Sequence, residues 1–221
     1  MPGAVIFDMD GVLIDSRRPH FISWQASCQA RGYRLDEATF DQLFGQPFVA
    51  WVAALAPEGL PETAIQEWYD DKEAHYRDLV RDDPPLMPGA DALIAELAAA
   101  GWHCGIGSAG PRANVELVRA ALPHGAAIGT ACSADDVARP KPAPDVFLLA
   151  AERLGLPPDR CIVIEDSLHG LAAAAAAGMA RVALTSTLPA VALRPHADRV
   201  IDGLAELSAD QLAQLLAQPL P

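Results

Sequence analysis

Short apolar runs that alternate with helical patterns constrain the fold of this chain more than any other feature. Apolar runs occur at residues 4–7, 102–106, 126–128, 161–164 and 181–184, with a weaker run near Val200. Helical patterns lie between them, at residues 91–100, 113–122, 145–154 and 168–177. Strands that alternate with helices of this length form a parallel sheet that is covered on both faces. The sequence therefore predicts an α/β fold.

One region, residues 17–83, interrupts the alternation. Its helical segments lie near residues 18–31, 37–44, 47–56 and 62–81, and it offers no strand candidate. We expect an all-helical domain at residues 17–83 and a core domain made of residues 1–16 and 84–221. In the last of the four helices, Lys72 stands among Asp70, Asp71 and Glu73. We expect it to be a salt-bridged lysine on the surface.

Charge and composition exclude several classes of partner. The chain has 29 Asp and Glu against 16 Lys and Arg, and this formal charge of −13 argues against nucleic-acid binding. The most apolar stretch, residues 171–184, is shorter than the ~20 residues that a membrane span needs. The N-terminus has no basic signal-peptide region, and the four cysteines form no C-x-x-C pair. We expect a cytoplasmic protein with reduced thiols and no membrane partner, whose oligomeric state the sequence does not indicate.

Acidic residues follow two of the predicted strands. Asp8 and Asp10 come after the first strand, and Glu165 and Asp166 follow residues 161–164. The carboxyl ends of parallel strands lie at one edge of a sheet, so these side chains should converge there. An oxygen-only cluster without His or Cys suits Mg²⁺ rather than zinc. The pattern predicts a magnesium site.

Donors for an anion are expected at the same edge. Ser108 and Ala109 come after the run at residues 102–106 and before Pro111, which suits the first turn of a helix. A hydroxyl and backbone N–H groups at a helix N-terminus bind phosphate oxygens. Lys141, one of only two lysines in the chain, lies between two prolines. Together these groups predict a phosphate site next to the metal.

These residues carry a family resemblance. The chain resembles the haloacid dehalogenase superfamily, in the branch that includes beta-phosphoglucomutase and sugar phosphatases. The shared motifs are Asp8-x-Asp10-Gly-Val-Leu, Ser108, Lys141 in Lys-Pro-Ala-Pro-Asp, and Glu165-Asp166-Ser-x-x-Gly170. The resemblance implies a Rossmann-like core, a helical cap inserted after the first motif, and Mg²⁺-dependent phosphoryl transfer.

The resemblance also assigns roles to single residues. It implies that Asp8 is the nucleophile that forms an aspartyl-phosphate, and that Asp10 protonates the leaving oxygen and then activates water. Mg²⁺ is expected to bind the Asp8 carboxylate, the Asp10 backbone carbonyl and Asp166. Glu165 is expected either to bind the ion directly or to contact the groups that do. Ser108, Ala109 and Lys141 are expected to hold the phosphoryl group.

Residues of the cap bear on the choice among related activities. In the family that the chain resembles, dehalogenases and phosphonate hydrolases lack the second Asp of the first motif, so the presence of Asp10 disfavours both activities. His20, in a His-x-x-x-Trp pattern, and Gln46 are candidates for substrate contact. The segment from Phe44 to Trp51 lacks the basic residues that a mutase uses for a second phosphate. Hydrolysis of a small phosphorylated metabolite is therefore favoured, with mutase activity and an inactive binding protein as the alternatives.

Overall fold

The computed structural model describes residues 3–46, 48–56 and 59–218. These residues form two compact units. The first comprises the chain up to Asp15 and from Pro85 onward, and the second is Ser16–Pro84. These borders differ by one residue at each end from the expected 17–83. Within the described residues, no helix combines the length and the apolar character that crossing a membrane requires.

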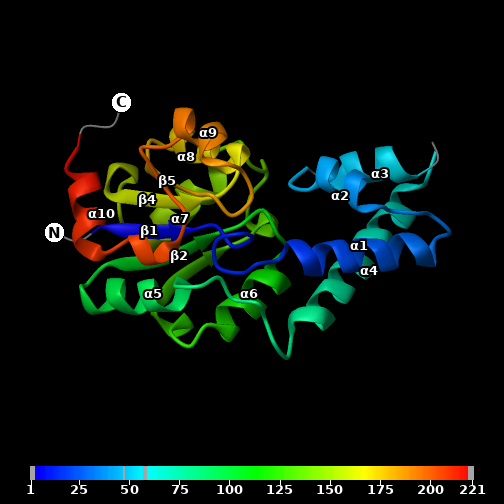
Figure 1. The fold of residues 1–221 in the computed structure, drawn as a ribbon, viewed down its shortest axis with the longest axis horizontal. Coiled ribbons are helices and arrows are strands. Elements are labelled where there is room, and N and C mark those ends of the chain that lie inside the picture. Colours follow the sequence, from blue (N-terminus) through cyan, green and yellow to red (C-terminus); the bar gives the residue numbers. More distant parts are fainter. Residues whose placement is uncertain (1–2, 47, 57–58, 219–221) are drawn as a thin grey trace. The chain divides into compact units, whose positions relative to one another are not determined.

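A six-stranded sheet forms the centre of the first unit (Figure 1). Its strands are β1 (Ala4–Phe7), β2 (His103–Gly107), β3 (Ile128–Cys132), β4 (Cys161–Glu165), β5 (Ala180–Leu184) and β6 (Arg199–Ile201). Their order is β3-β2-β1-β4-β5-β6, and every pairing is parallel. The predicted α/β class with a Rossmann-like core is confirmed.

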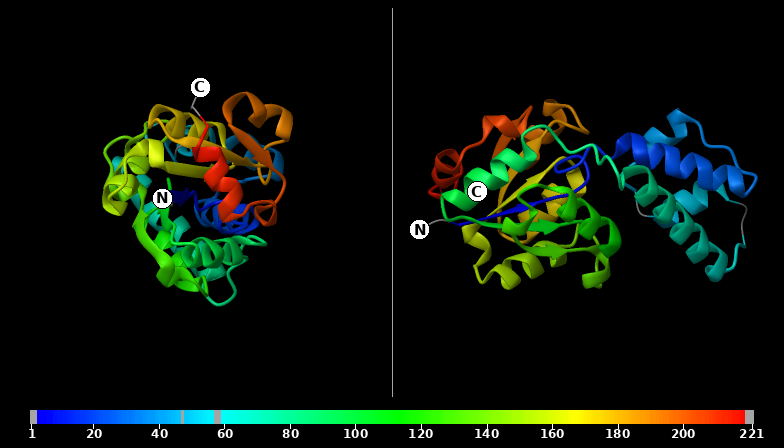
Figure 2. Two further views of the ribbon diagram at one scale, coloured as in Figure 1. Left: turned by 90° about the vertical axis from the view of Figure 1, so that its left-hand side faces the viewer. Right: turned by 90° about the horizontal axis from the view of Figure 1, so that it is seen from below.

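Helices cover this sheet. They are α5 (Ala90–Ala99), α6 (Arg112–Ala121), α7 (Asp145–Leu154), α8 (Leu168–Ala176), α9 (Ala190–Leu193) and α10 (Ala209–Leu216). Alternate residues of a strand face one side, and Ile6 and Val163 pack there against Phe147 of α7 and Ala173 of α8. The right-hand view of Figure 2 shows α5 and α10 on the other side, where Glu96 accepts a hydrogen bond from the backbone N–H of Ala209 at 2.8 Å.

Two parts of the core differ from the sequence prediction. The third strand begins at Ile128 rather than at residue 126, because residues 125–127 form a turn of 3₁₀ helix. Strand β3 lies at an edge and contains Gly129 and Thr130, so it pairs on one side only and shows no continuous apolar run. The sequence prediction also missed α9 and α10. Helix α10 begins at Ala209, directly after Ser208, whose side chain accepts a hydrogen bond from the backbone N–H of Gln211.

The second unit is all-helical within the residues described. It contains α1 (Arg17–Ala30), α2 (Glu37–Leu43), α3 (Phe48–Leu55) and α4 (Glu62–Val80). Aromatic side chains make its core, and the rings of Trp24 and Trp51 stack with centroids 4.1 Å apart. Phe44 and Phe48 pack against the same cluster. Burial of these large rings gives a small helical unit its own apolar core.

Lys72 corrects one expectation, because it is buried rather than on the surface. Its side chain is 3% exposed, and its Nζ lies 2.7 Å from Oε1 of Glu73 and 2.8 Å from Nδ1 of His20. The ring of His20 stacks on Tyr76 with a centroid distance of 4.1 Å. Four consecutive polar residues on a helix span more than one turn. They therefore cannot all face the solvent, and Lys72 and Glu73 are the two that point inward.

Candidate active site

Three of the four acidic residues predicted at the sheet edge, Asp8, Glu165 and Asp166, are brought together by β1 and β4. Phe7 pairs with Ile164, so Asp8 and Glu165 follow at neighbouring positions. The backbone N–H of Asp8 donates to the carbonyl of Ile164 at 2.9 Å. Strands β1 and β4 also mark the point where the strand order reverses, which is where open parallel sheets bind ligands.

Three buried carboxylates form the centre of this site. Asp8, Glu165 and Asp166 each offer an oxygen, and these oxygens lie within 4.8 Å of one another. Lys141 supplies positive charge, since its Nζ donates to Oδ1 of Asp8 at 2.6 Å and to Oε1 of Glu165 at 2.8 Å. Lys141 thus pairs with two of the three buried acids, Asp8 and Glu165, so the cluster holds more acids than ammonium groups.

The pKa values of the cluster reflect this surplus of acid. Burial, with smaller contributions from Glu165 and Asp10, raises the pKa of Asp8 to about 7, although Lys141 acts to lower it. Burial, together with Glu165 and Asp8, raises the pKa of Asp166 well above its usual range. Burial acts to lower the pKa of Lys141, but the two acids outweigh it and raise that pKa. A hard divalent cation would supply the missing charge, so this all-oxygen donor set fits Mg²⁺.

Hydrogen bonds orient two of these carboxylates. Oε2 of Glu165 accepts the backbone N–H groups of Asp166 at 2.8 Å and Ser167 at 2.7 Å. Oδ2 of Asp166 accepts the hydroxyl of Ser186 at 3.2 Å and that of Thr187. The two hydroxyls follow β5, and the sequence prediction missed them. They could have been found from the sequence, because ligands bind at the carboxyl ends of parallel strands and these residues come directly after the fifth apolar run.

Two glycines leave space for the same carboxylates. A Cβ on Gly11, whose φ is +77°, would lie 2.0 Å from Oδ2 of Asp166. A Cβ on Gly170 would lie 1.6 Å from Oε1 of Glu165. Both positions therefore require glycine because of the acid beside them, and Gly11 requires it for its backbone conformation as well.

Ser108 follows directly after β2, at the same edge of the sheet as the cluster. It is buried, and its Oγ accepts the backbone N–H of Gly110 at 2.9 Å. Ala109 is exposed, and α6 begins three residues later at Arg112. A Cβ on Gly110 would lie 3.3 Å from Oγ of Ser108 and 3.8 Å from Oδ2 of Asp10. Gly110 therefore lies close to both the predicted phosphate-binding hydroxyl and the second predicted catalytic acid.

The other predicted site residues belong to the helical unit. His20 is half-buried and contacts Lys72 and Tyr76 as described above. Gln46 is exposed, and its backbone N–H donates to the carbonyl of Leu43 at 2.9 Å. Both stay candidates for substrate contact.

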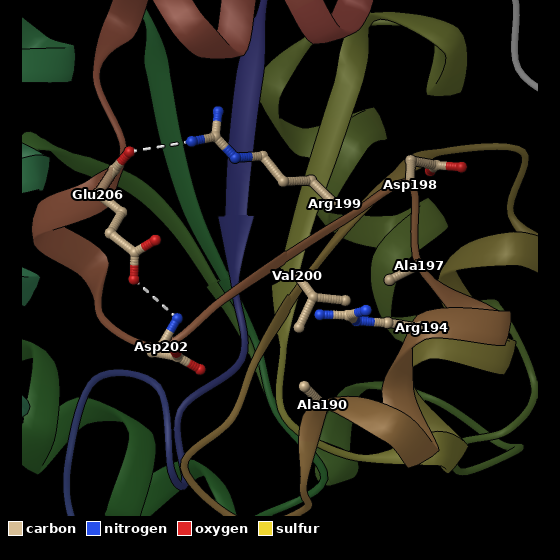
Figure 3. A pocket seen from close by; sticks show the side chains of 8 residues that line it. All are labelled: Ala190, Arg194, Ala197, Asp198, Arg199, Val200, Asp202 and Glu206. Carbon is tan, nitrogen blue, oxygen red and sulfur yellow. Dashed lines mark hydrogen bonds between the residues drawn. The ribbon is translucent and has the colours of Figure 1, made fainter.

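A surface pocket of about 520 Å³ lies around α9 and β6 (Figure 3). Its lining residues are Ala190, Arg194, Ala197, Asp198, Arg199, Val200, Asp202 and Glu206. Arg199 donates to the carbonyl of Glu206 at 3.1 Å, and the Glu206 carboxylate accepts the backbone N–H of Asp202 at 2.8 Å. This lining shares no residue with the carboxylate cluster.

Comparison with known proteins places the chain among phosphate-processing enzymes. The family model described as haloacid dehalogenase-like hydrolase matches residues 2–178. Protein CbbY of Rhodobacter capsulatus is 33% identical over 192 residues, which are 82% of this chain and 84% of that protein. Fructose-1-phosphate phosphatase YqaB of Escherichia coli is 30% identical over 181 residues, 79% of this chain and 92% of that protein.

A solved structure shows the same arrangement of elements. A variant of CbbY from Rhodobacter sphaeroides, in complex with xylulose-1,5-bisphosphate, superposes with a TM-score of 0.81 at 28% identity. The superposition covers 94% of this chain and 96% of that one.

Proposed function

Because the chain belongs to the haloacid dehalogenase-like hydrolases, as its motifs indicated and the family model confirms, we propose that Asp8 attacks the phosphorus of a small phosphomonoester. The observation that carries the proposal is the Asp8 carboxylate, which is buried among two further acids and paired with Lys141 at 2.6 Å. Such an environment fixes the position of a carboxylate nucleophile and excludes bulk water from it.

Two carboxylates divide the chemical work. In the first step an oxygen of Asp8 bonds to phosphorus, the bond from phosphorus to the substrate oxygen breaks, and Asp10 gives its proton to the departing alkoxide. In the second step Asp10 takes a proton from a water molecule, whose oxygen bonds to phosphorus and displaces Asp8. Asp10 is only partly buried and lies close to Gly110, which suits a group that must meet both the leaving alcohol and water.

Mg²⁺ would be held by the Asp8 and Asp166 carboxylates, the backbone carbonyl of Asp10 and Glu165, directly or through water. When bound, the ion offsets the negative charge of the carboxylates and the phosphoryl oxygens. Ser186 and Thr187 orient Asp166 toward it, as the hydrogen bonds to Oδ2 suggest.

Three groups would hold the transferring phosphoryl group. The Ser108 hydroxyl and the backbone N–H of Ala109 lie just before α6, and the positive end of a helix favours anions. The Lys141 ammonium lies beside the nucleophile and stays protonated, because the two acids raise its pKa. Phosphoryl transfer depends mainly on such positioning and charge.

The helical unit bears on the substrate. The segment from Phe44 to Trp51 carries no Lys or Arg that could hold a second phosphate. A small monophosphate, such as a sugar phosphate, is therefore preferred, and His20 and Gln46 are proposed to contact it. Relatives named for fructose-1-phosphate and solved with xylulose-1,5-bisphosphate make sugar phosphates the first compounds to test.

The test is a panel of phosphorylated metabolites and an aryl phosphate, assayed for phosphate release with Mg²⁺ and with EDTA. The wild type should release phosphate with Mg²⁺ only, and Asp8→Asn should release none while keeping its fold by circular dichroism. Asp159→Asn, at an exposed position, is the matched control and should be fully active. Full activity of Asp8→Asn would refute the assignment. Isomerisation of a sugar monophosphate without phosphate release would instead show the mutase.

A further inference from the structure

A buried aromatic ring lies against the Lys141 ammonium of the carboxylate cluster. The Nζ of Lys141 is 4.4 Å from the ring centroid of Phe147, and Phe147 is fully buried. A cation within about 6 Å of an aromatic face is attracted by the ring's quadrupole, and the attraction is strongest where water is excluded. Lys141 is 6% exposed, so this condition holds.

The same ring contacts the end of β2, just before Ser108. A Cβ on Gly107 would lie 2.8 and 2.9 Å from two carbons of the Phe147 ring. The backbone N–H of Phe147 donates to the carbonyl of Pro144 at 3.1 Å, which fixes it in the first turn of α7. The ring is thus held between the end of β2 and the Lys141 ammonium.

Arg139 and Asp145 hold the two ends of the segment that carries Lys141. The Arg139 guanidinium donates to the Asp145 carboxylate at 3.1 and 2.9 Å. Asp145 is the first residue of α7 and lies two positions before Phe147. The Arg139–Asp145 ion pair therefore connects the loop that carries Lys141 to the start of α7, which carries Phe147.

We propose that Phe147 is a positioning residue of the reaction, whose ring face holds the Lys141 ammonium at the transferring phosphoryl group. The proposal rests on the function proposed above. Lys141 donates hydrogen bonds to Asp8, which reacts, and to Glu165, which is assigned to the metal. Asp8 changes its bonding during the reaction, whereas Glu165 and the ring do not react. Phe147 therefore supplies, beside Glu165, a contact to the ammonium that stays the same throughout.

Fluorination of the ring separates this role from simple packing. Each fluorine weakens the negative potential of the ring face while shape and apolar character stay nearly constant. We expect kcat/KM to fall in steps as position 147 carries 4-fluoro-, 3,5-difluoro- and 3,4,5-trifluorophenylalanine. The trifluoro variant should have a kcat/KM about 30-fold below that of the wild type. The melting temperature should change little across the series. Phe147→Leu should lower kcat/KM as much as the trifluoro variant does. Phe147→Trp and Phe147→Tyr, which keep an aromatic face, should have a smaller decrease in kcat/KM than Phe147→Leu.

Binding of inorganic phosphate with Mg²⁺, measured calorimetrically, gives a readout without turnover. Its Kd should rise in the same order as fluorine is added. Trifluorophenylalanine at Phe21, which packs edge-to-face on Phe40 in the helical unit, is the control and should leave Kd unchanged. Unchanged kcat/KM and Kd across the position-147 series would overturn the proposal. A wild type without phosphatase activity would refute the proposed function, and the phosphate series would still decide the role of the ring.

Discussion

Alanine at Gly170 tests the packing of Glu165 against α8. The new Cβ would lie 1.6 Å from Oε1, 1.9 Å from Cδ and 2.6 Å from Cγ of Glu165, so the carboxylate must move. Glu165 accepts hydrogen bonds from the backbone N–H groups of Asp166 and Ser167 and from Lys141. Hydrogen bonds to a charged group contribute about 1.5–3 kcal/mol each, so loss of two costs about 4 kcal/mol.

Helix propensity acts in the other direction. Gly170 lies inside α8, where alanine is favoured over glycine by about 1 kcal/mol. The net expectation is a loss of about 3 kcal/mol, or about 10 °C in melting temperature for a chain of this size. Because Glu165 is displaced, Mg²⁺ should also bind more weakly.

Thermal melts followed by circular dichroism and calorimetric titration with Mg²⁺ measure both effects. Gly203→Ala is the control, because its Cβ would meet no atom within 4 Å and its φ is −157°. It should leave both values unchanged. A Gly170→Ala variant with the melting temperature and Mg²⁺ affinity of the wild type would refute this account of the cluster.

Three other perturbations probe charge and orientation. Without metal, the Asp8 pKa of about 7 exceeds the unfolded value of about 3.9, so the free energy of unfolding should fall by about 3–4 kcal/mol between pH 4 and 7. Chemical denaturation across this range should show that the free energy of unfolding depends less on pH in Asp8→Asn than in the wild type. The same pH dependence in both proteins would contradict the raised pKa of Asp8. Thr187→Val should weaken Mg²⁺ binding about 10-fold by calorimetry, whereas Thr185→Val, whose hydroxyl donates to Asp202, should not. Lys72→Met removes the ammonium that is paired with the buried Glu73 and should cost about 3 kcal/mol in chemical denaturation, whereas the double variant with Glu73→Gln should cost clearly less; equal losses would argue against a stabilising Lys72–Glu73 pair.

The central strands were predictable because each of them is an uninterrupted apolar run. Residues 4–7 and 161–164 are apolar throughout, since β1 and β4 are buried on both faces. The edge strand β3 was misplaced because it pairs on one side only. Four of its five residues, Gly129 to Cys132, are small.

The acids of the site were predictable from one topological rule. Asp8, Glu165 and Asp166 follow strands that adjoin in the sheet, so their meeting requires only the strand order. The ring of Phe147 under Lys141 was not predictable, because it depends on how α7 packs against β2. The burial of Lys72 depends likewise on the packing of α4 and α1 around it.

The direct test of the central claim is the detection of phosphate on Asp8. Asp10→Asn should slow the second step, in which water displaces Asp8, more than it slows the first step. The phosphorylated form of Asp8 should therefore accumulate. After incubation with substrate and Mg²⁺ and an acid quench, mass spectrometry of the N-terminal peptide should show one phosphoryl group on Asp8. Phosphate release in the wild type, with no phosphorylated Asp8 in either protein under rapid quench, would contradict the claim.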